Sequence, residues 1–189
     1  GVVPAVLVLA LAGLALSMFR PAWFEVRLSP YKGLPQALQA PGAVLVSQRW
    51  NAVARVDVVD SPALHAAPGM SLGCQAPQPA QQALFVDGDN PSPLLLADPT
   101  SLRAWAGCLP LALPFALRPG ADTLVLEPGG DLDPLLAQAL GAGRLTVVEP
   151  NRLLAEAAGG QPGADLVLES GRAFLRRAGE RFDLVDLAL

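Results

Sequence analysis

Leu124-Val-Leu-Glu-Pro-Gly-Gly-Asp131 and Leu145-Thr-Val-Val-Glu-Pro-Asn151 share one layout, in which an apolar run ends on a glutamate. A glycine turn follows the first run, and the residues between the two stretches have helical spacing, with Pro134 tolerated in the first turn. The order is therefore strand, tight loop, helix and strand. Its second strand ends on Glu149, the place where nucleoside-binding folds put a carboxylate beside a ribose.

The rest of the C-terminal half continues the alternation of strands and helices. We expect strands over 123–127, 145–148, 165–169 and 182–187, and helices over 102–113, 134–140, from 151 onward and over 172–177. Strands that alternate with helices form a parallel, doubly wound sheet with right-handed crossovers. The sequence therefore predicts an α/β fold with a doubly wound parallel sheet, truncated at its C-terminal end.

Ligands of such sheets bind where the strands end, so the loops at the carboxyl ends are the candidate site. Glycines allow the backbone to turn sharply and to approach a ligand, and a glutamate accepts hydrogen bonds from both ribose hydroxyls. The candidate binding residues on these loops are Glu127, Gly129, Gly130, Asp131, Glu149, Asn151, Glu169, Ser170 and Gly171.

The composition of the first loop separates two ligand classes. A dinucleotide site has the pattern Gly-x-Gly-x-x-Gly and holds a pyrophosphate at a helix N-terminus. This loop instead carries Asp131 and Asp133, which repel a pyrophosphate and suit a cationic sulfonium or amino group. S-adenosylmethionine or a relative is favoured over NAD. An ordinary α/β sheet whose two glycines only form a turn is the alternative.

Residues 25 to 96 have the pattern of a small β-rich unit. Alternating apolar and polar positions predict strands over 43–47 and 53–59 with a turn over 48–51, and a further strand over 83–86 ends at the turn 87–91. His65, the only histidine, lies in a loop without a carboxylate or cysteine at ligand spacing. We interpret it as a solvated or structural side chain.

The N-terminal residues 2–19 contain no charged side chain, and about 27 Å of helix would match the hydrocarbon thickness of a bilayer. Arg20 and Lys32 follow, and Trp23 and Phe24 would lie in the interfacial aromatic belt. We expect a transmembrane helix, with a signal peptide as the alternative. The positive flank then places the following domains in the cytoplasm.

Composition excludes some functions and favours others. A net charge of -4 without a basic stripe argues against nucleic-acid binding. The hydrophobic fraction of 52% and the mean hydropathy of +0.40 favour contact with a membrane. Cys74 and Cys108 have no partners at metal spacing, and we expect two buried thiols in a reducing cytoplasm and no metal. Both ends of the chain look cut, so we expect a fragment of a longer protein.

Seven stretches in the same order resemble the spermidine synthase-like family, above all its membrane-fused bacterial members. They are residues 27–34, 50–59, 85–89, 109–115, 124–133, 148–151 and 170–175. The resemblance implies a small β domain in front of a Rossmann-like methyltransferase domain. With the apolar N-terminal segment, the expected units are 1–20, 21–98 and 99–189. It further implies that Gly129, Gly130, Glu149 and residues 169–171 line a nucleoside pocket for S-adenosylmethionine or its decarboxylated form.

The departures from the family pattern concern the acid–base residues. Classical aminopropyltransferases have Tyr-x-Glu-Met-x-x-His-x-Pro before the Rossmann-like domain; here Leu102, Ala104 and Cys108 stand at the tyrosine, glutamate and histidine positions. Ala188 takes the place of the aspartate that orients the amine. Asp186 and Asp87 are the weak candidates for a substitute catalytic group.

Three hypotheses remain from the sequence. The first is a transferase at the inner membrane, with its soluble domain in the cytoplasm, that uses an adenosyl sulfonium donor and an acceptor such as a polyamine. The second is a non-catalytic domain that senses a nucleoside or polyamine for an attached transporter-like membrane domain. The third is a methyltransferase. The oligomeric state stays open, with a homodimer among the alternatives.

Overall fold

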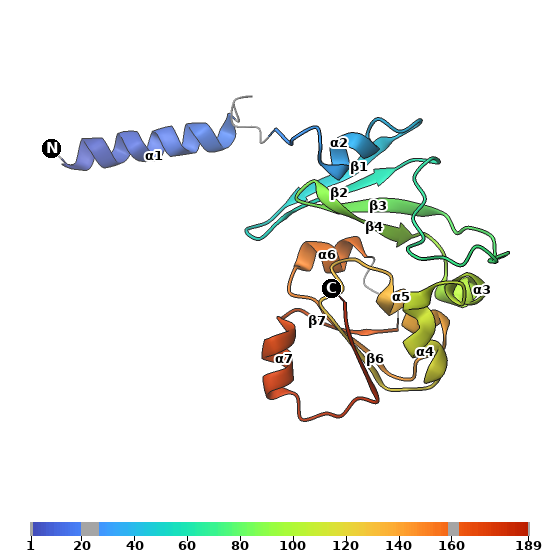
Figure 1. The fold of residues 1–189 in the computed structure, drawn as a ribbon. Helices are drawn as coiled ribbons and strands as arrows, with labels where there is room; N and C mark the ends of the chain where they lie inside the picture. Colours follow the sequence, from blue (N-terminus) through green and yellow to red (C-terminus); the bar gives the residue numbers. More distant parts are fainter. Residues whose placement is uncertain (1, 20–26, 159–162, 189) are drawn as a thin grey trace.

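The computed structural model describes residues 2–19, 27–158 and 163–188. Figure 1 shows a small antiparallel sheet packed above an α/β unit. The mixed α/β architecture with a parallel sheet confirms the predicted fold class. The expected interfacial residues Arg20, Trp23 and Phe24 lie outside the described residues.

The N-terminal apolar segment forms the helix α1 (Val2–Met18), which is 17 residues long. Among the residues that the structure describes, no helix combines the length and the apolar character needed to cross a bilayer. The structure therefore does not support the transmembrane helix expected over residues 1–20.

The small domain is a four-stranded antiparallel meander in the order β1-β2-β3-β4. Its strands are β1 (Val44–Trp50), β2 (Arg55–Asp60), β3 (Gln81–Val86) and β4 (Asp89–Leu95), and the short helix α2 (Gly33–Ala37) precedes them. One face of the sheet packs on α2 through Val59 and Phe85. The other face packs on the C-terminal domain.

Two sequence predictions in the small domain were wrong. The expected turn over 48–51 belongs largely to β1, and the chain reverses one step later, where Asn51 accepts hydrogen bonds from the N–H groups of Val53 and Ala54. Residues 87–91 were expected to form a turn, whereas strand β4 begins at Asp89; its two prolines, Pro91 and Pro93, are unfavourable within most strands. Both prolines fit here because β4 is an edge strand of the sheet.

The expected continuous helix over 102–113 is broken into four short pieces: η2 (Pro99–Leu102), α3 (Arg103–Ala106), η3 (Pro110–Ala112) and α4 (Leu113–Leu117). Pro110 has no N–H to continue the hydrogen-bond ladder, so the chain restarts there. The apolar periodicity nevertheless predicted the buried face correctly. Its buried members, which include Leu102, Leu109 and Trp105, form the main core under the parallel sheet.

The parallel sheet has the strand order β7-β6-β5-β8. Its strands are β5 (Thr123–Leu126), β6 (Leu145–Val148), β7 (Asp165–Val167) and β8 (Leu184–Leu187), and every pairing between them is parallel. In sequence order this is 3-2-1-4, the order of a Rossmann-like half-sheet. Residues of β5 and β6 are buried at every position, as expected of a central parallel strand.

Three helices connect these strands: α5 (Asp133–Ala139), α6 (Arg152–Ala157) and α7 (Gly171–Arg177). Helix α6 also carries the contact between the two domains. Its Leu153 and Leu154 pack against the small sheet in one apolar cluster with Val56 and Leu84. The loops at the carboxyl ends of β5 and β6 therefore lie directly beneath the small domain.

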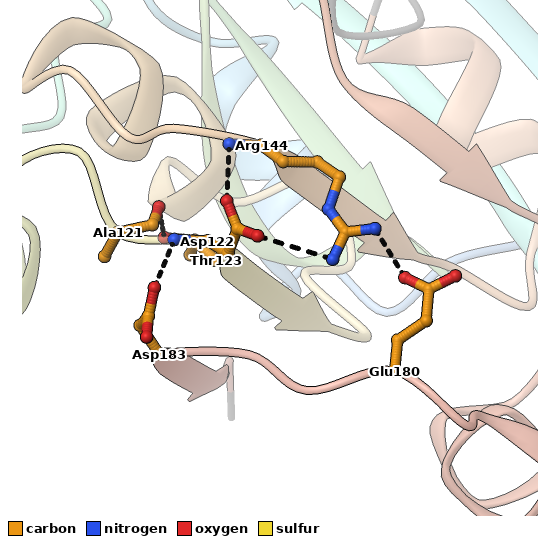
Figure 2. Close-up of polar contacts among 6 residues, drawn as sticks. All are labelled: Ala121, Asp122, Thr123, Arg144, Glu180 and Asp183. Atoms are coloured by element: carbon orange, nitrogen blue, oxygen red, sulfur yellow. Dashed lines mark hydrogen bonds and ion pairs between the residues drawn. The ribbon is translucent and has the colours of Figure 1, made fainter.

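The opposite, amino-terminal edge of the parallel sheet is held by paired charges (Figure 2). The guanidinium of Arg144 contacts Asp122 at 3.5 Å and Glu180 at 2.6 Å. The Asp122 backbone N–H donates to the Asp183 carboxylate at 3.0 Å. These contacts join the segments that enter β5, β6 and β8, so this edge has a structural role.

The two cysteines form a disulfide between Cys74 and Cys108, so the expectation of two free thiols was wrong. The loop between β2 and β3 folds back over α3, where the Ser71 N–H donates to the Cys108 carbonyl at 3.0 Å. Both cysteines are half-buried. A cytoplasmic location stays a prediction, and it would require this disulfide to persist in a compartment where such bonds are rare.

Candidate functional site

Glu149 connects the two loops that the sequence singled out. Its carboxylate accepts a hydrogen bond from the Gly129 N–H at 3.0 Å and another from the Asn151 N–H at 2.7 Å. The residue is only 4% exposed. Burial raises the pKa of Glu149. The two backbone hydrogen bonds favour the charged form and lower the pKa, but their effect is smaller than that of burial. In this structure the carboxylate therefore fixes the glycine loop of β5 to the start of α6.

The glycine loop depends on backbone conformations that favour glycine. Glu127, Gly129 and Gly130 all have positive φ angles, at 53°, 61° and 96°. A Cβ on Gly130 would lie 3.2 Å from the Leu84 side chain of β3. Gly130 is therefore needed both for the turn and for the close approach of the small domain.

The start of α6 joins the two domains by polar contacts. Asn151 caps the helix by accepting a hydrogen bond from the Leu153 N–H, and its side chain also accepts one from the Asn51 amide at 2.7 Å. One turn later, Glu156 pairs with Arg49 at 2.6 Å. Asn151 was predicted to bind ligand; the structure gives its side chain a capping and interdomain role.

The third predicted loop, which follows β7, is tied to the first. The Gly171 N–H donates to the Glu127 carboxylate at 2.7 Å, and Ser170 caps α7 by accepting from the Ala173 N–H. Glu169 pairs with Arg177, and this contact raises the pKa of the arginine. The three loops therefore lie together at one edge of the sheet, as the sequence predicted. The carboxylates of Glu127 and Glu149 each accept a hydrogen bond from a backbone N–H of another of these loops.

Beside the glycine loop lies a group of three aspartates, Asp131, Asp133 and Asp186. Asp133 begins α5 and is 6% exposed, while Asp186 lies on β8 next to Val125 of β5. Burial raises the pKa of Asp133 to about 6, and the charges of Asp186 and then Asp131 add to the effect. Burial also raises the pKa of Asp186, whose Oδ2 is buried without a hydrogen-bond partner among the described residues.

In the described parts of the chain, these aspartates have no cationic neighbour. Within the described residues, the ion pairs involve other carboxylates, and none of the three contacts a lysine or arginine. Uncompensated negative charge at a buried position attracts a cation. The sequence singled out both Asp131 and Asp133 as charges that suit a cation, but only Asp131 was placed among the binding residues. The Asp-Pro pair at a helix start would place Asp133 in the first turn, close to the loop.

The space beneath the glycine loop is nearly closed. A cavity of about 20 Å³ is lined by residues of the loop, of α6 and of β6, among them Gly130, Glu149 and Leu154. Such a volume holds about one water molecule. A nucleoside would enter only if α6 and the glycine loop separated.

The positions of the usual acid–base residues carry no acid–base chemistry. Leu102 is 3% exposed and belongs to the main core, and Cys108 is engaged in the disulfide. Ala188, at the aspartate position, has no ionisable side chain. Its N–H donates to the Leu126 carbonyl at 3.3 Å and extends the backbone hydrogen bonds between β8 and β5. Burial raises the pKa of three carboxyls close to the glycine loop, those of Glu149, Asp133 and Asp186. Glu149 already accepts two backbone hydrogen bonds, so Asp133 and Asp186 are the better candidates for proton transfer.

Asp87 lies in the turn between β3 and β4, outside this cluster. It has a positive φ of 52°, and its carboxylate accepts a hydrogen bond from the Arg55 N–H at 2.9 Å. Asp89 accepts from the Gly33 N–H at 3.2 Å. These contacts give both aspartates a turn-stabilising role. His65 is exposed and lies on the far face of the small sheet.

A metal site is not visible in the part of the chain that the structure describes, where no three His, Cys, Asp or Glu side chains gather in a suitable group. The expectation of a metal-free protein stays a prediction.

Comparison with known proteins gives a likeness in fold. No protein-family model matches the chain, and no curated protein matches it. Among solved structures, spermidine synthase from Thermotoga maritima is similar over 76% of this chain and 47% of its own, with a TM-score of 0.49 and 15% identity. A spermidine synthase in complex with the transition state analogue AdoDATO gives the same TM-score and identity over 77% and 46%. The chain spans about half the length of these proteins.

Proposed function

We propose that this protein binds an adenosyl sulfonium, S-adenosylmethionine or its decarboxylated form, at the carboxyl edge of the parallel sheet. The observation that carries the proposal is the group of three aspartates beside the glycine loop, which has no cationic partner among the described residues. A sulfonium places its positive charge near such a group, whereas a pyrophosphate would be repelled.

The proposed reaction is transfer of an alkyl group from the sulfonium to an acceptor. In aminopropyl transfer, the acceptor nitrogen forms a bond to the methylene beside the sulfur, the carbon–sulfur bond breaks with its electron pair on sulfur, and the nitrogen loses a proton. Asp133, with a pKa of about 6, is close enough to neutral pH to accept that proton in its ionised form. Asp186 is the second candidate base, since burial also raises its pKa.

A non-catalytic ligand-sensing domain is the second candidate function. A specific observation favours it: the family's tyrosine and histidine positions hold a core leucine and a disulfide-bonded cysteine, Leu102 and Cys108. A methyltransferase is the third candidate, because it requires donor binding and proximity more than a base. None of these proposals depends on attachment to a membrane.

Donor binding is tested by calorimetry with two ligands that differ in charge. S-adenosylmethionine has a sulfonium and S-adenosylhomocysteine has a neutral thioether in its place. We expect Asp131→Asn to weaken the sulfonium ligand by about tenfold and the thioether by less than about twofold, because a half-buried charge contributes mainly to the cation.

Glu180→Gln is the matched control, since it removes the same charge at the opposite edge of the sheet. It should leave both affinities unchanged. Absence of binding of either ligand, or an equal effect of Asp131→Asn on both, would refute the site.

Catalysis is tested separately by incubation with decarboxylated S-adenosylmethionine and putrescine, with release of methylthioadenosine as the readout. Release that is lost in Asp133→Asn supports the transferase. Tight binding without release, for putrescine and for methyl acceptors, supports the sensing domain.

A further inference from the structure

A second cavity lies in the small domain, away from the proposed nucleoside site. It has a volume of about 400 Å³ and is bounded by α2, the loop at residues 64–66, β3 and β4. The side chains of Ala83 and Phe85 alternate with Leu84, which packs toward α6 on the opposite face of the sheet. The cavity therefore opens on the face that the C-terminal domain does not cover.

The lining of this cavity is uncharged. No Asp, Glu, Lys or Arg is among its residues, and its apolar surface comes from Ala37, Leu64, Ala83 and Phe85 together with two prolines of β4. The prolines supply rigid walls without N–H groups. A volume of this size and this lining is in the range of small-molecule sites, which are mostly apolar with a few polar groups.

Gln81 lines the cavity and has a buried donor without a partner among the described residues. The side-chain oxygen of Gln81, Oε1, accepts a hydrogen bond from the Ala66 N–H at 2.9 Å, and this contact fixes the orientation of the side-chain amide. The amide nitrogen, Nε2, is buried and has no partner among the described residues. Gln81 as a whole is 6% exposed. An unsatisfied buried donor is unfavourable, and an acceptor atom that reached it would remove this penalty.

His65 lies at the rim of the same cavity. It is exposed, and its ring makes no hydrogen bond to any residue that the structure describes. Because Nε2 of Gln81 is closed off from water, an acceptor reaches it only when a lining side chain shifts. His65 precedes Ala66, whose N–H holds the Gln81 side-chain oxygen, so it is one of the lining side chains beside this amide.

We propose that this cavity binds an uncharged, largely apolar small molecule whose carbonyl-type oxygen accepts a hydrogen bond from the Gln81 amide. The uncharged lining disfavours ions, Phe85 provides an aromatic wall, and the orphan donor selects an acceptor. The site is independent of the proposed nucleoside site, because it lies on the other face of the small sheet.

The test uses two fluorinated probes of nearly equal size, 4-fluoroacetophenone and 4-fluoroethylbenzene, and measures affinity by ¹⁹F NMR titration of the full chain. Only the ketone has a hydrogen-bond acceptor of the required kind. We expect the ketone to bind about fivefold more tightly, the factor expected for one net hydrogen bond. The side-chain amide signals of Gln81, assigned by their loss in Gln81→Met, should shift with the ketone.

A cavity-filling variant and a matched control locate the binding. Ala83→Leu places extra atoms in the cavity and should weaken both probes by about tenfold or more. Ala104→Leu makes the same change at an exposed position of α3 and should have no effect. Thermal melts check that each variant is folded, and the amide signals of the unmodified chain locate the probe without any variant.

Absence of binding at millimolar probe concentration overturns the proposal. Equal affinity for the two probes, unchanged Gln81 amide signals, or full binding by a folded Ala83→Leu protein overturns it as well.

Discussion

Replacement of Asp133 by asparagine should stabilise the protein at neutral pH, and this gain should disappear at acidic pH. Burial and two neighbouring carboxylates raise the pKa of Asp133 from 3.8 to about 6 in the folded state. The folded protein therefore holds this proton more tightly than the unfolded chain, so the wild type loses stability as the pH rises through this interval. One pKa unit corresponds to about 1.4 kcal/mol, so the full loss is about 3 kcal/mol.

Asparagine keeps the shape of the side chain and removes the charge, so Asp133→Asn should not lose this stability. We expect the two proteins to have similar free energies of unfolding at about pH 2.5, where the aspartate is protonated in both states. Above about pH 7 the variant should be more stable by up to about 3 kcal/mol. Part of this gain is offset because a carboxylate in the first turn of α5 interacts favourably with the helix dipole.

Urea denaturation at several pH values measures the difference, with the fluorescence of the buried Trp105 among the signals. Asp165→Asn is the control, since it removes the same charge from an exposed position of β7 and should change the stability by less than about 0.5 kcal/mol. If Asp133→Asn is no more stable than the wild type at about pH 8, the aspartate group is not under the electrostatic stress inferred here.

Three further predictions concern the frame around the site. Gly130→Ala should destabilise the protein by about 1–3 kcal/mol in urea denaturation, because φ is 96° and the new Cβ would lie 3.2 Å from a leucine of β3. Gly120 has a φ of 75° and open space around it, so Gly120→Ala is the control that measures the cost of the backbone conformation alone. Arg144→Ala should cost about 0.5–1.5 kcal/mol, less at high salt, and leave ligand affinity unchanged. Reduction of the Cys74–Cys108 disulfide, with a sequence separation of 34, should lower the melting temperature and the stability by about 2–4 kcal/mol.

The sequence predicted the parallel sheet well because its signals are local. The apolar runs that form β5 and β6 are buried on both faces, and the turns with Gly129 and Gly130 mark where the chain reverses. Strand β4 could not be predicted, since Pro91 and Pro93 are acceptable only on an edge strand and the strand order is a tertiary property.

For the candidate site, the sequence predicted which loops meet but not how their side chains are used. Glu149 was expected to face a ribose, and the structure shows its carboxylate holding two backbone N–H groups. The disulfide was missed because Cys74 and Cys108 approach each other only when the loop after β2 folds over α3. The stress on Asp133 was also invisible, because it depends on Asp186, which is distant in the sequence and joins it through β8.

The two edges of the parallel sheet differ in how completely their charges are paired. At the amino edge Arg144 pairs with both Asp122 and Glu180 in a solvent-exposed cluster, whereas at the carboxyl edge Asp131, Asp133 and Asp186 have no cation among the described residues. An arrangement that lowers stability persists where it serves a function, because a bound cation relieves the repulsion. The same substitution, Asp133→Asn, therefore separates two explanations. If it stabilises the fold and also weakens S-adenosylmethionine more than S-adenosylhomocysteine, one set of charges accounts for both the instability and the proposed ligand preference. If it stabilises the fold without changing that preference, the buried charge is only a structural burden and the sulfonium must be recognised elsewhere.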